Sequence, residues 1–425
     1  MSFPRYESYK DSGVEWLGEL PEHWEIKKIR RVISAPLING IFKKKREFGK
    51  GVLLVNVFDI YQDDFKIKPD NLDRVRCEAN EINTYQVLSG DLFFVRSSLK
   101  QEGVAVVAVA GDHIEPVVFE CHLIRVRPDK TLLDARYGSY LLNSALYRYQ
   151  LIARAKITTM TTIDQEAILS ILLTAPPVPE QKIIASFLDC ETTKIDELIG
   201  EQQRLIELLK EKRQAVISHA VTKGLNPDVP MKDSGIQWLG EVPEHWNVMA
   251  LKRIASLKSG ETITSNHIEE TGEYPVYGGN GLRGYTSRYT HDGEYPLIGR
   301  QGALCGNINY AKGKFWASEH AVVVSLIKPL IIKWLGETLR AMNLNQYSVS
   351  AAQPGLSVEI VSNLPFPVPP FTEQQSIATF LDRETTKIEE LITEAKQAIE
   401  LLKERRTALI SAAVTGKIDI RGATV

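Results

Sequence analysis

The 425-residue sequence predicts an α+β protein in which two globular domains are joined by two long antiparallel helices. A short motif and a long helical segment each occur twice in the same order, which indicates duplicated halves with a pseudo-two-fold relation. The segments between the repeats differ from each other and contain short strand-like runs separated by turn residues. Two copies are too few for a solenoid, which needs three or more repeats to bury a continuous core.

The first element, residues 1–24, ends in the short motif. Lys10–Trp24 reads KDSGVEWLGELPEHW and Lys232–Trp246 reads KDSGIQWLGEVPEHW, so 12 of 15 positions are identical. The Glu-His pair within each copy has no third side chain nearby in the sequence that would complete a metal site. Each copy is therefore interpreted as a turn anchored by its tryptophan.

The second element, residues 25–175, is predicted to be the first globular domain. Gly51–Ile60, Asp91–Arg96 and Val104–Val109 have the pattern of strands, and a more helical stretch follows near Leu132–Ala153. Lysine suits phosphate contacts, and arginine can also bond base edges. The candidate nucleic-acid contacts from these residue types are Lys43, Lys44, Lys45, Arg46, Arg96 and Lys100. A solvated charged loop remains the alternative for residues 43–46.

The third and fifth elements, residues 176–246 and 369–425, carry the helical repeat. One copy begins PPVPEQKIIASFLDCETTKIDELI and the other PPFTEQQSIATFLDRETTKIEELI, with 31 identities over 48 positions. Apolar residues at alternating three- and four-residue steps predict a coiled-coil seam along helices of about 60 Å. The predicted seam and docking positions are Leu188, Ile195, Leu198, Leu205, Leu209, Leu381, Ile388, Leu391, Leu402 and Leu409. An intramolecular antiparallel pair is favoured over a dimerisation coil, and a kink at the paired threonines is left open.

The fourth element, residues 247–368, is predicted to be a second domain of short strands, rich in glycine and tyrosine. Arginine, asparagine and glutamine can bond base edges in pairs, and neighbouring glycines let the backbone come close. The candidate contacts are Tyr277, Asn280, Arg283, Tyr285, Arg300 and Gln301. A plain hairpin turn remains the alternative for residues 299–302.

Composition and motif searches exclude several classes of protein. A formal charge of −2 excludes a nucleic-acid-binding protein with a uniformly basic surface. No apolar run approaches the length of a membrane span, and a cytoplasmic location is expected. The four cysteines form no CxxC pair, and no P-loop, HExxH or amino-methyltransferase motif occurs, so no metal or catalytic residue is predicted. A nuclease or methyltransferase with degenerate motifs, and a coiled-coil adaptor that binds only protein, remain the competing interpretations.

Taken together, KDSG-x-x-WLGE-x-PEHW, PPxxEQ-x-x-IA-x-FLD-x-ETTKI and the AVT ending resemble the specificity subunit of type I restriction–modification systems. YPVYGGNGLRGY, IGRQGALCG and FWASEHA resemble one class of target recognition domain. GDLFFVRSS resembles another, which adds Ser97 and Ser98 to the candidate DNA contacts. One departure is Lys223, which stands where the second copy has Gly416, so the cap of the first long helix is left open.

The resemblance implies a DNA-binding subunit that catalyses nothing. It implies that residues 25–175 and 247–368 are two recognition domains for an asymmetric double-stranded DNA target in two parts, separated by a nonspecific gap. It also implies that the helices dock two methyltransferase (modification) subunits and that restriction subunits, which are translocases and nucleases, join that core. S-adenosylmethionine, ATP and magnesium would then belong to the partner subunits, with no cofactor bound by this chain.

Overall fold

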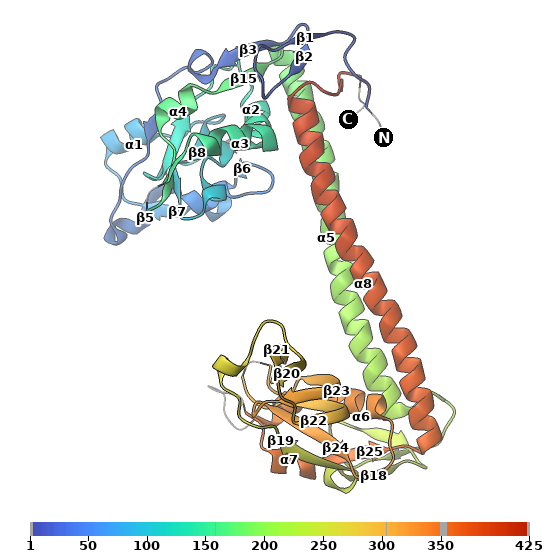
Figure 1. The fold of residues 1–425 in the computed structure, drawn as a ribbon. Helices are drawn as coiled ribbons and strands as arrows, with labels where there is room; N and C mark the ends of the chain where they lie inside the picture. The colour runs from blue at the N-terminus through green and yellow to red at the C-terminus, as the bar shows by residue number, and fades with distance from the viewer. Residues whose placement is uncertain (1–2, 158, 303, 349–354, 423–425) are drawn as a thin grey trace. The chain divides into compact units, whose positions relative to one another are not determined.

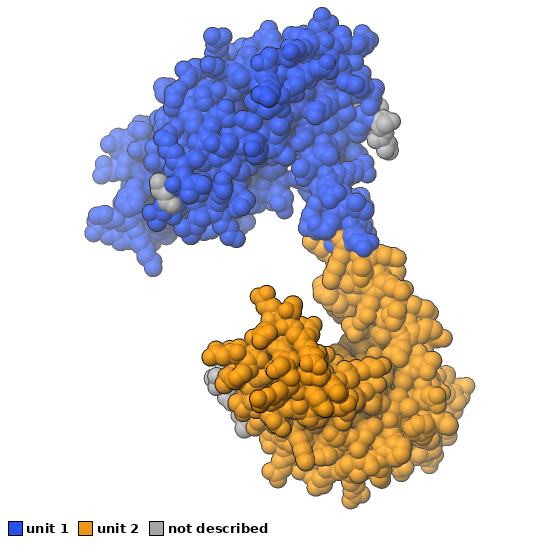
Figure 2. Space-filling view, viewed as in Figure 1, with its two compact units in different colours: residues 1–202, 397–425 blue, residues 203–396 orange. Residues whose placement is uncertain are grey.

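The computed structural model describes residues 3–157, 159–302, 304–348 and 355–422. It consists of two compact units, coloured separately in Figure 2: residues 1–202 with 397–425, and residues 203–396. The chain passes from one unit to the other inside two long helices, α5 (Val178–Lys223) and α8 (Phe371–Val414), which Figure 1 labels. The predicted fold class, an α+β chain with two globular parts joined by long helices, is confirmed. Within the described residues, no helix is both long and apolar enough to cross a membrane.

Unit 1 builds its globular part from short, mostly antiparallel strands. Its five-stranded sheet has the order β4, β12, β8, β10, β6, and a three-stranded sheet has the order β11, β5, β7. A second three-stranded sheet, β13-β14-β9, and a two-stranded sheet, β15-β3, complete the domain, and β1 pairs with β2. The strands are β1 (Tyr9–Asp11), β2 (Glu19–Pro21), β3 (Glu25–Lys28), β4 (Ile38–Asn39), β5 (Phe48–Val55), β6 (Lys66–Ile67), β7 (Asp73–Val75), β8 (Leu92–Val95), β9 (Ser97–Ser98), β10 (Val107–Ala110), β11 (Val117–Phe119), β12 (Leu123–Val126), β13 (Lys156–Ile157), β14 (Thr161–Thr162) and β15 (Leu172–Ala175). The shorter helices are α1 (Ala79–Tyr85), α2 (Ala135–Asn143), α3 (Ala145–Ala153) and α4 (Gln165–Leu169).

Strand β8 explains why the middle of unit 1 is a continuous apolar run in the sequence. All four of its residues are buried, and alternate side chains enter different cores. Phe94 packs in the core that contains Tyr137 of α2, whereas Phe93 packs in the core that contains Phe119 of β11. A strand covered on both faces shows no polar alternation.

Unit 2 is built around one six-stranded sheet with the order β19, β24, β22, β23, β20, β21, in which only β20 and β23 are parallel. Its strands are β16 (Met231–Asp233), β17 (Glu241–Pro243), β18 (Asn247–Ala250), β19 (Ala255–Ser259), β20 (Tyr274–Gly278), β21 (Gly281–Thr286), β22 (His291–Gly299), β23 (Ile308–Ala317), β24 (Ala321–Leu326) and β25 (Pro365–Val368). Its shorter helices are α6 (Ile332–Ala341) and α7 (Val358–Asn363). On β22, Ile298 packs in the core with Trp334 of α6, and Leu297 packs on the opposite face with Phe315.

The repeated PEHW motif clamps the start of a long helix in each unit. In unit 1, Trp24 Nε1 donates to Glu180 Oε1 at 3.1 Å, and the Tyr6 hydroxyl donates to the same oxygen at 2.8 Å. His23 Nε2 lies 2.8 Å from Glu180 Oε2. A carboxylate in the first helical turn also complements the helix dipole. The Trp-anchored turn predicted from the sequence is confirmed, and its partner is the glutamate of the EQ pair.

Unit 2 repeats this clamp with one donor fewer. Trp246 Nε1 donates to Glu373 Oε2 at 2.9 Å, and His245 Nε2 lies 2.6 Å from Glu373 Oε1. The Glu373 side chain is 39% exposed, whereas that of Glu180 is 7% exposed. The same motif therefore holds a buried glutamate in one unit and an accessible one in the other.

The end of the other long helix packs against each clamp. In unit 2, α5 ends at Lys223, and Gly224 takes a positive φ of 78° against Trp246. In unit 1, Gly416 takes a φ of 70°, and a Cβ there would lie 2.4 Å from Pro21. The cap that the sequence left open is therefore formed by the glycine one place later in the first copy, because only glycine adopts this conformation easily.

The two long helices are antiparallel neighbours in each unit, as predicted. Arg406 of α8 donates to Asp196 of α5 at 2.9 Å in unit 1, and Arg213 pairs with Glu389 at 3.0 Å in unit 2. Both helices run without a break through Thr192 and Thr385, whose hydroxyls donate to the carbonyl four residues earlier.

The seam prediction is corrected at three positions. Leu198, Leu205 and Leu391 are 44%, 42% and 47% exposed, so they lie outside the buried stripe. The seam passes instead through the neighbouring Ile199 and Ile206, because steps of four and three from Leu188 reach those residues. The other predicted positions are buried or half-buried: Leu188, Ile195, Leu209, Leu381, Ile388, Leu402 and Leu409.

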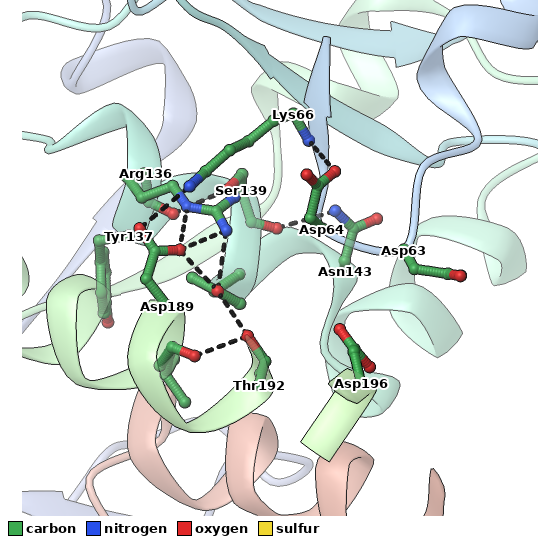
Figure 3. A network of polar contacts seen from close by, with 12 residues as sticks. Asp63, Asp64, Lys66, Arg136, Tyr137, Ser139, Asn143, Asp189, Thr192 and Asp196 are labelled. Carbon is green, nitrogen blue, oxygen red and sulfur yellow. Dashed lines mark hydrogen bonds and ion pairs between the residues drawn. The ribbon is translucent and has the colours of Figure 1, made fainter. Parts of the chain in front are cut away.

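The FLD part of the repeat attaches each globular domain to its helix. In unit 1, Asp189 Oδ1 accepts from Arg136 Nε at 2.7 Å and from the Tyr140 hydroxyl at 2.8 Å, and Oδ2 accepts from Lys66 at 3.2 Å (Figure 3). Burial alone would raise the pKa of this carboxyl, but the hydrogen bonds and charges of its partners hold the pKa below its usual range. In unit 2 the corresponding Asp382 has Lys333 of α6 at 3.1 Å.

Candidate nucleic-acid interface

The two variable domains share a backbone framework around one arginine each. In unit 1, strand β8 ends before Arg96, whose N–H donates to the carbonyl of His122 at 2.7 Å. Its carbonyl accepts from Ile163 at 2.9 Å, where the chain returns toward the long helix. Arg96 is thus fixed between the start of β12 and the return segment that contains β14.

Unit 2 has the same bonds around Arg300, which follows β22. Its N–H donates to the carbonyl of His320 at 2.9 Å, and its carbonyl accepts from Leu356 at 2.9 Å. Ile163 and Leu356 occupy the same position in the repeat, 193 residues apart. The two arginines are therefore structural counterparts.

A glycine turn extends the correspondence. Gly40 N–H donates to Leu123 at 3.2 Å, and Gly260 N–H donates to Ala321 at 2.9 Å. A Cβ at either glycine would lie 2.2 Å from a backbone carbonyl oxygen, so no other residue fits without a shift of the backbone. Both domains thus have a close backbone approach where β4 pairs with β12 in unit 1 and where β19 pairs with β24 in unit 2.

Both counterpart arginines can reach a ligand. Arg96 is exposed and Arg300 is half-buried, and among the described residues neither guanidinium has a hydrogen bond or an ion pair. A guanidinium without a carboxylate partner can bond a phosphate or the acceptor edge of guanine. Of the residues predicted to contact nucleic acid, these two are held by the shared backbone framework with their guanidinium groups available to a ligand.

The other candidates in the first domain divide into engaged and accessible side chains. Ser97 is 7% exposed, and its Oγ lies 2.6 Å from His122 Nδ1, so it supports a neighbour and has little surface of its own. Ser98 Oγ accepts from the backbone of Lys100 at 3.2 Å, and the Lys100 side chain is exposed. Arg148 holds the loop that carries Lys100 by donating hydrogen bonds to the carbonyls of residues 102 and 104. Burial lowers the pKa of the Arg148 guanidinium to about 10.

A groove runs beside these residues on unit 1. It has a volume of about 640 Å³ and is lined on one side by the apolar side chains of Phe58, Tyr61 and Leu99. Phe58 and Leu99 are 82% and 83% exposed, respectively. Its polar lining residues are Ser97, Ser98, Lys100, Glu102, Glu120 and His122. The groove therefore combines exposed apolar side chains with hydrogen-bond donors and two carboxylates.

The basic run of residues 43–46 is not uniform. Lys43 is 8% exposed and donates to Glu81 of α1 at 2.8 Å, with Glu47 at 3.5 Å. Lys44, Lys45 and Arg46 are exposed. The charge of Lys43 is already compensated, so the surface charge of this run comes from the other three residues.

In the second domain, glycines bring the predicted residues together. The β20–β21 hairpin tip approaches the Arg300 turn so closely that a Cβ on Gly279 would lie 3.2 Å from the carbonyls of Gln301 and His320. Asn280 at the tip and Arg283 are exposed. Tyr277 faces inward, edge-on to Phe315 at 5.7 Å, and burial raises the pKa of its phenol. Tyr285 is half-buried and pairs through its backbone with Glu269.

Sequence reasoning missed His122 and His320. They stand at the same place of the framework, directly before β12 and β24, but they occur in dissimilar local sequences. The signal that could have found them is an arginine directly after one strand together with a histidine directly before a later strand. Without the register of the sheet this pairing cannot be read from the sequence.

A metal site at His122 has little support. Among the described residues, Glu120, Cys121 and His122 form a group whose potential ligand atoms lie within 4.8 Å of one another. Burial, followed by the charge of Glu120, raises the pKa of the Cys121 thiol, which opposes the thiolate that a metal needs. The same turn of unit 2 has Ser318 and Glu319 in the places of Glu120 and Cys121, so the two units share the histidine and not a ligand set.

Comparison with protein families gives a match to the type I restriction modification DNA specificity domain over residues 243–401. The chain is 48% identical to the EcoprrI specificity subunit of Escherichia coli over 137 residues, which are 31% of this chain and 34% of that protein. It is 24% identical to a putative type I restriction enzyme specificity subunit, MjaX, of Methanocaldococcus jannaschii over 99% of both chains.

Two solved structures share the fold. One, from work on complex assembly and conformational transition of the type I R-M system, matches with a TM-score of 0.75 at 16% identity and covers 93% of this chain and 98% of that one. The other, the HsdS subunit from Thermoanaerobacter tengcongensis, matches with a TM-score of 0.58 at 16% identity and covers 94% and 98%. These similarities support the fold of the whole described chain.

Proposed function

We propose that this chain is a specificity subunit of a type I restriction–modification system, a family to which it is similar in sequence. It is the non-catalytic DNA-recognition subunit of such a complex. Residues 25–175 read one half of a two-part asymmetric target, and residues 247–368 read the other half. The observation that carries this proposal is the pair of arginines, Arg96 and Arg300, which are held by the same backbone bonds in two otherwise different domains and whose guanidinium groups have no partner among the residues that the structure describes.

The chemistry around each arginine fits double-stranded DNA. In the first domain Lys100 and residues 44–46 add accessible charge for phosphates, and in the second Asn280, Arg283 and Gln301 add groups that can bond base edges. Different side chains on a common framework give different half-site sequences, and hence an asymmetric target. The net charge of −2 is compatible with this role because partner subunits would complete the grip on DNA.

The long helices would dock the partners. Leu198 and Leu208 of α5 are 44% and 52% exposed, and their repeat counterparts Leu391 and Leu401 of α8 are 47% and 65% exposed. Large exposed apolar side chains at equivalent positions favour two copies of one partner. We assign this role to two modification subunits that use S-adenosylmethionine. Restriction subunits that use ATP and magnesium would join that core, in the cytoplasm where the DNA lies.

The decisive experiment exchanges one domain. Residues 25–175 are replaced by the corresponding segment of a relative, the chain is produced with its modification subunits, and methylated sites in the cell's DNA are mapped. One half of the methylated motif should change while the other half stays the same. If both halves change together, the assignment of one domain to each half is wrong. Methylation or cleavage by the purified chain alone would instead identify an enzyme, and a complex that retains no specific DNA would identify a protein adaptor.

A second experiment tests the helices as the spacer of the target. Because the helices are paired, seven residues are inserted in both, after Gln202 and after Lys396, where each passes between the units. This preserves the seam and adds about 10 Å of helix. The nonspecific gap should lengthen by at most about three base pairs, since DNA rises about 3.4 Å per base pair. An active complex with an unchanged gap would show that the helices do not set the spacing.

A further inference from the structure

The histidine that opens β12 and the one that opens β24 are placed by the same contacts. In each unit its carbonyl accepts the backbone N–H of the counterpart arginine, His122 from Arg96 and His320 from Arg300. In each unit its ring Nδ1 meets the side chain of the residue after that arginine. His122 Nδ1 lies 2.6 Å from Ser97 Oγ, and His320 Nδ1 lies 3.1 Å from Gln301 Oε1.

The accessible member of the pair differs between the units. In unit 1 Ser97 is buried and His122 is exposed, so the serine fixes the ring and the ring faces outward. Among the described residues, Nε2 of His122 has no hydrogen-bond partner, and the ring lines the groove beside Lys100. In unit 2 Gln301 is exposed and His320 is 42% exposed, with Glu319 at 3.1 Å from its Nε2. There the ring is held from both sides and orients the glutamine.

We propose that these two histidines belong to the DNA-reading surface, His122 as a direct contact through Nε2 and His320 as a positioning residue for Gln301. The inference rests on the proposed function and adds two residues to the proposed DNA-reading surface, one at the equivalent place of each unit. Each domain then presents two adjacent polar groups to its own half-site. In the first domain these are Arg96 and His122, whose backbones are hydrogen-bonded to each other, and in the second they are the consecutive residues Arg300 and Gln301. Two fixed groups next to each other discriminate bases better than one flexible arginine.

Side-chain shape separates the two roles. Asparagine places an amide near the position of Nδ1, and glutamine places one near the position of Nε2. If His122 contacts DNA through Nε2, His122→Gln should retain more binding than His122→Asn. If His320 acts by holding Gln301 through Nδ1, His320→Asn should retain more binding than His320→Gln. The expected orders are opposite, so a general loss of folding cannot produce both.

The experiment measures binding of the complex with its modification subunits to three duplexes: the cognate target, one with the first half-site scrambled, and one with the second half-site scrambled. His122→Ala should weaken cognate binding by about tenfold and leave binding to the first-half-scrambled duplex within about twofold. His320→Ala should show the same pattern for the second half-site. The two variants serve as controls for each other because each should spare the other half-site.

The outcomes separate this inference from the function beneath it. If the unaltered complex prefers no duplex, the proposed function fails and the inference falls with it. If the unaltered complex prefers the cognate duplex but His122→Ala does not change that preference, only the inference is overturned. It is also overturned if both histidines show the same order of rescue, with asparagine and glutamine ranking alike at the two sites.

Discussion

The PEHW motif holds the start of each long helix, but the glutamate that it binds is buried in unit 1 and accessible in unit 2. Glu180 receives three partners, Tyr6, His23 and Trp24, and is 7% exposed, whereas Glu373 receives two and is 39% exposed. The difference comes from residues outside the repeat, because Tyr6 precedes the repeated motif. We therefore expect these nearly identical motifs to contribute different amounts of stability, with the larger contribution where the glutamate is buried.

The two variable domains show the opposite relation. Their sequences have no comparable match, yet Gly40 and Gly260 make the same close backbone approach and Arg96 and Arg300 receive the same bonds. In these domains the framework is shared and the exposed side chains differ. Repeated sequence thus marks the places where the domains join the long helices, and the shared backbone framework marks the surfaces that we propose read DNA.

The largest expected effect is on the buried clamp. Glu180→Ala should lower the free energy of unfolding by about 3 kcal/mol, because it leaves the buried Trp24 and Tyr6 donors unpaired. Glu373→Ala should cost about 1 kcal/mol, because water can replace the carboxylate. Urea unfolding followed by tryptophan fluorescence measures both.

Glu180→Gln is the matched control for the clamp, because glutamine keeps an acceptor for one of the donors. Its free energy of unfolding should lie between that of the unaltered protein and that of Glu180→Ala. Equal losses for Glu180→Ala and Glu373→Ala would show that burial does not distinguish the two clamps.

The next effect concerns the counterpart arginines. Arg300→Ala should cost about 1–3 kcal/mol of binding to the cognate target if the guanidinium bonds a base edge, and much less on unrelated DNA. Arg96→Ala should behave in the same way, because the same framework presents it. Competition binding of the complex with cognate and random duplexes checks this. Equal losses on both duplexes would make either residue a phosphate contact.

The sequence predicted the attachments of the long helices better than it predicted the backbone framework that the two variable domains share. The PEHW turns, the helix starts at residues 178 and 371 and the antiparallel pair follow from repeated motifs and apolar periodicity, which are local signals. The seam was misplaced at Leu198 and Leu205 because a wide apolar stripe allows two nearly parallel paths along a helix. The shared framework was missed because backbone hydrogen bonds leave no residue signature except glycine at a close approach. Lys43 was listed among the candidate DNA contacts, and its ion pair could not be foreseen because its partner Glu81 is 38 positions away in the sequence.

A smaller effect is expected where the domains meet their helices. Asp189→Asn should destabilise unit 1 by about 1 kcal/mol at pH 7, and Asp382→Asn should destabilise unit 2 by a few tenths, because Asp382 is 62% exposed with a single lysine. The pKa of Asp189 is held below its unfolded value, so its contribution is present above pH of about 4 and disappears as pH falls through the folded pKa. Unfolding measured at pH 7 and near pH 3 should therefore show Asp189→Asn converging with the unaltered protein at low pH. A loss for Asp189→Asn that does not depend on pH would mean that packing, and not the carboxylate charge, attaches the domain.

The smallest effect separates two neighbouring lysines of the first domain. Lys44→Gln should lower the slope of log affinity against log salt by about 0.9, the value for one phosphate contact, and weaken binding by only a few-fold at physiological salt. Lys43→Gln should leave the slope unchanged, because Lys43 is 8% exposed and its charge is already used by Glu81 and Glu47. Since Lys43→Gln also removes an ion pair that holds α1, its thermal stability is measured in parallel and a lower melting temperature is expected for that variant alone. Titrating the complex with its target at four salt concentrations gives both slopes. If Lys43→Gln lowers the slope as much as Lys44→Gln does, the ion pair with α1 opens when DNA binds and the whole run of residues 43–46 faces the phosphates.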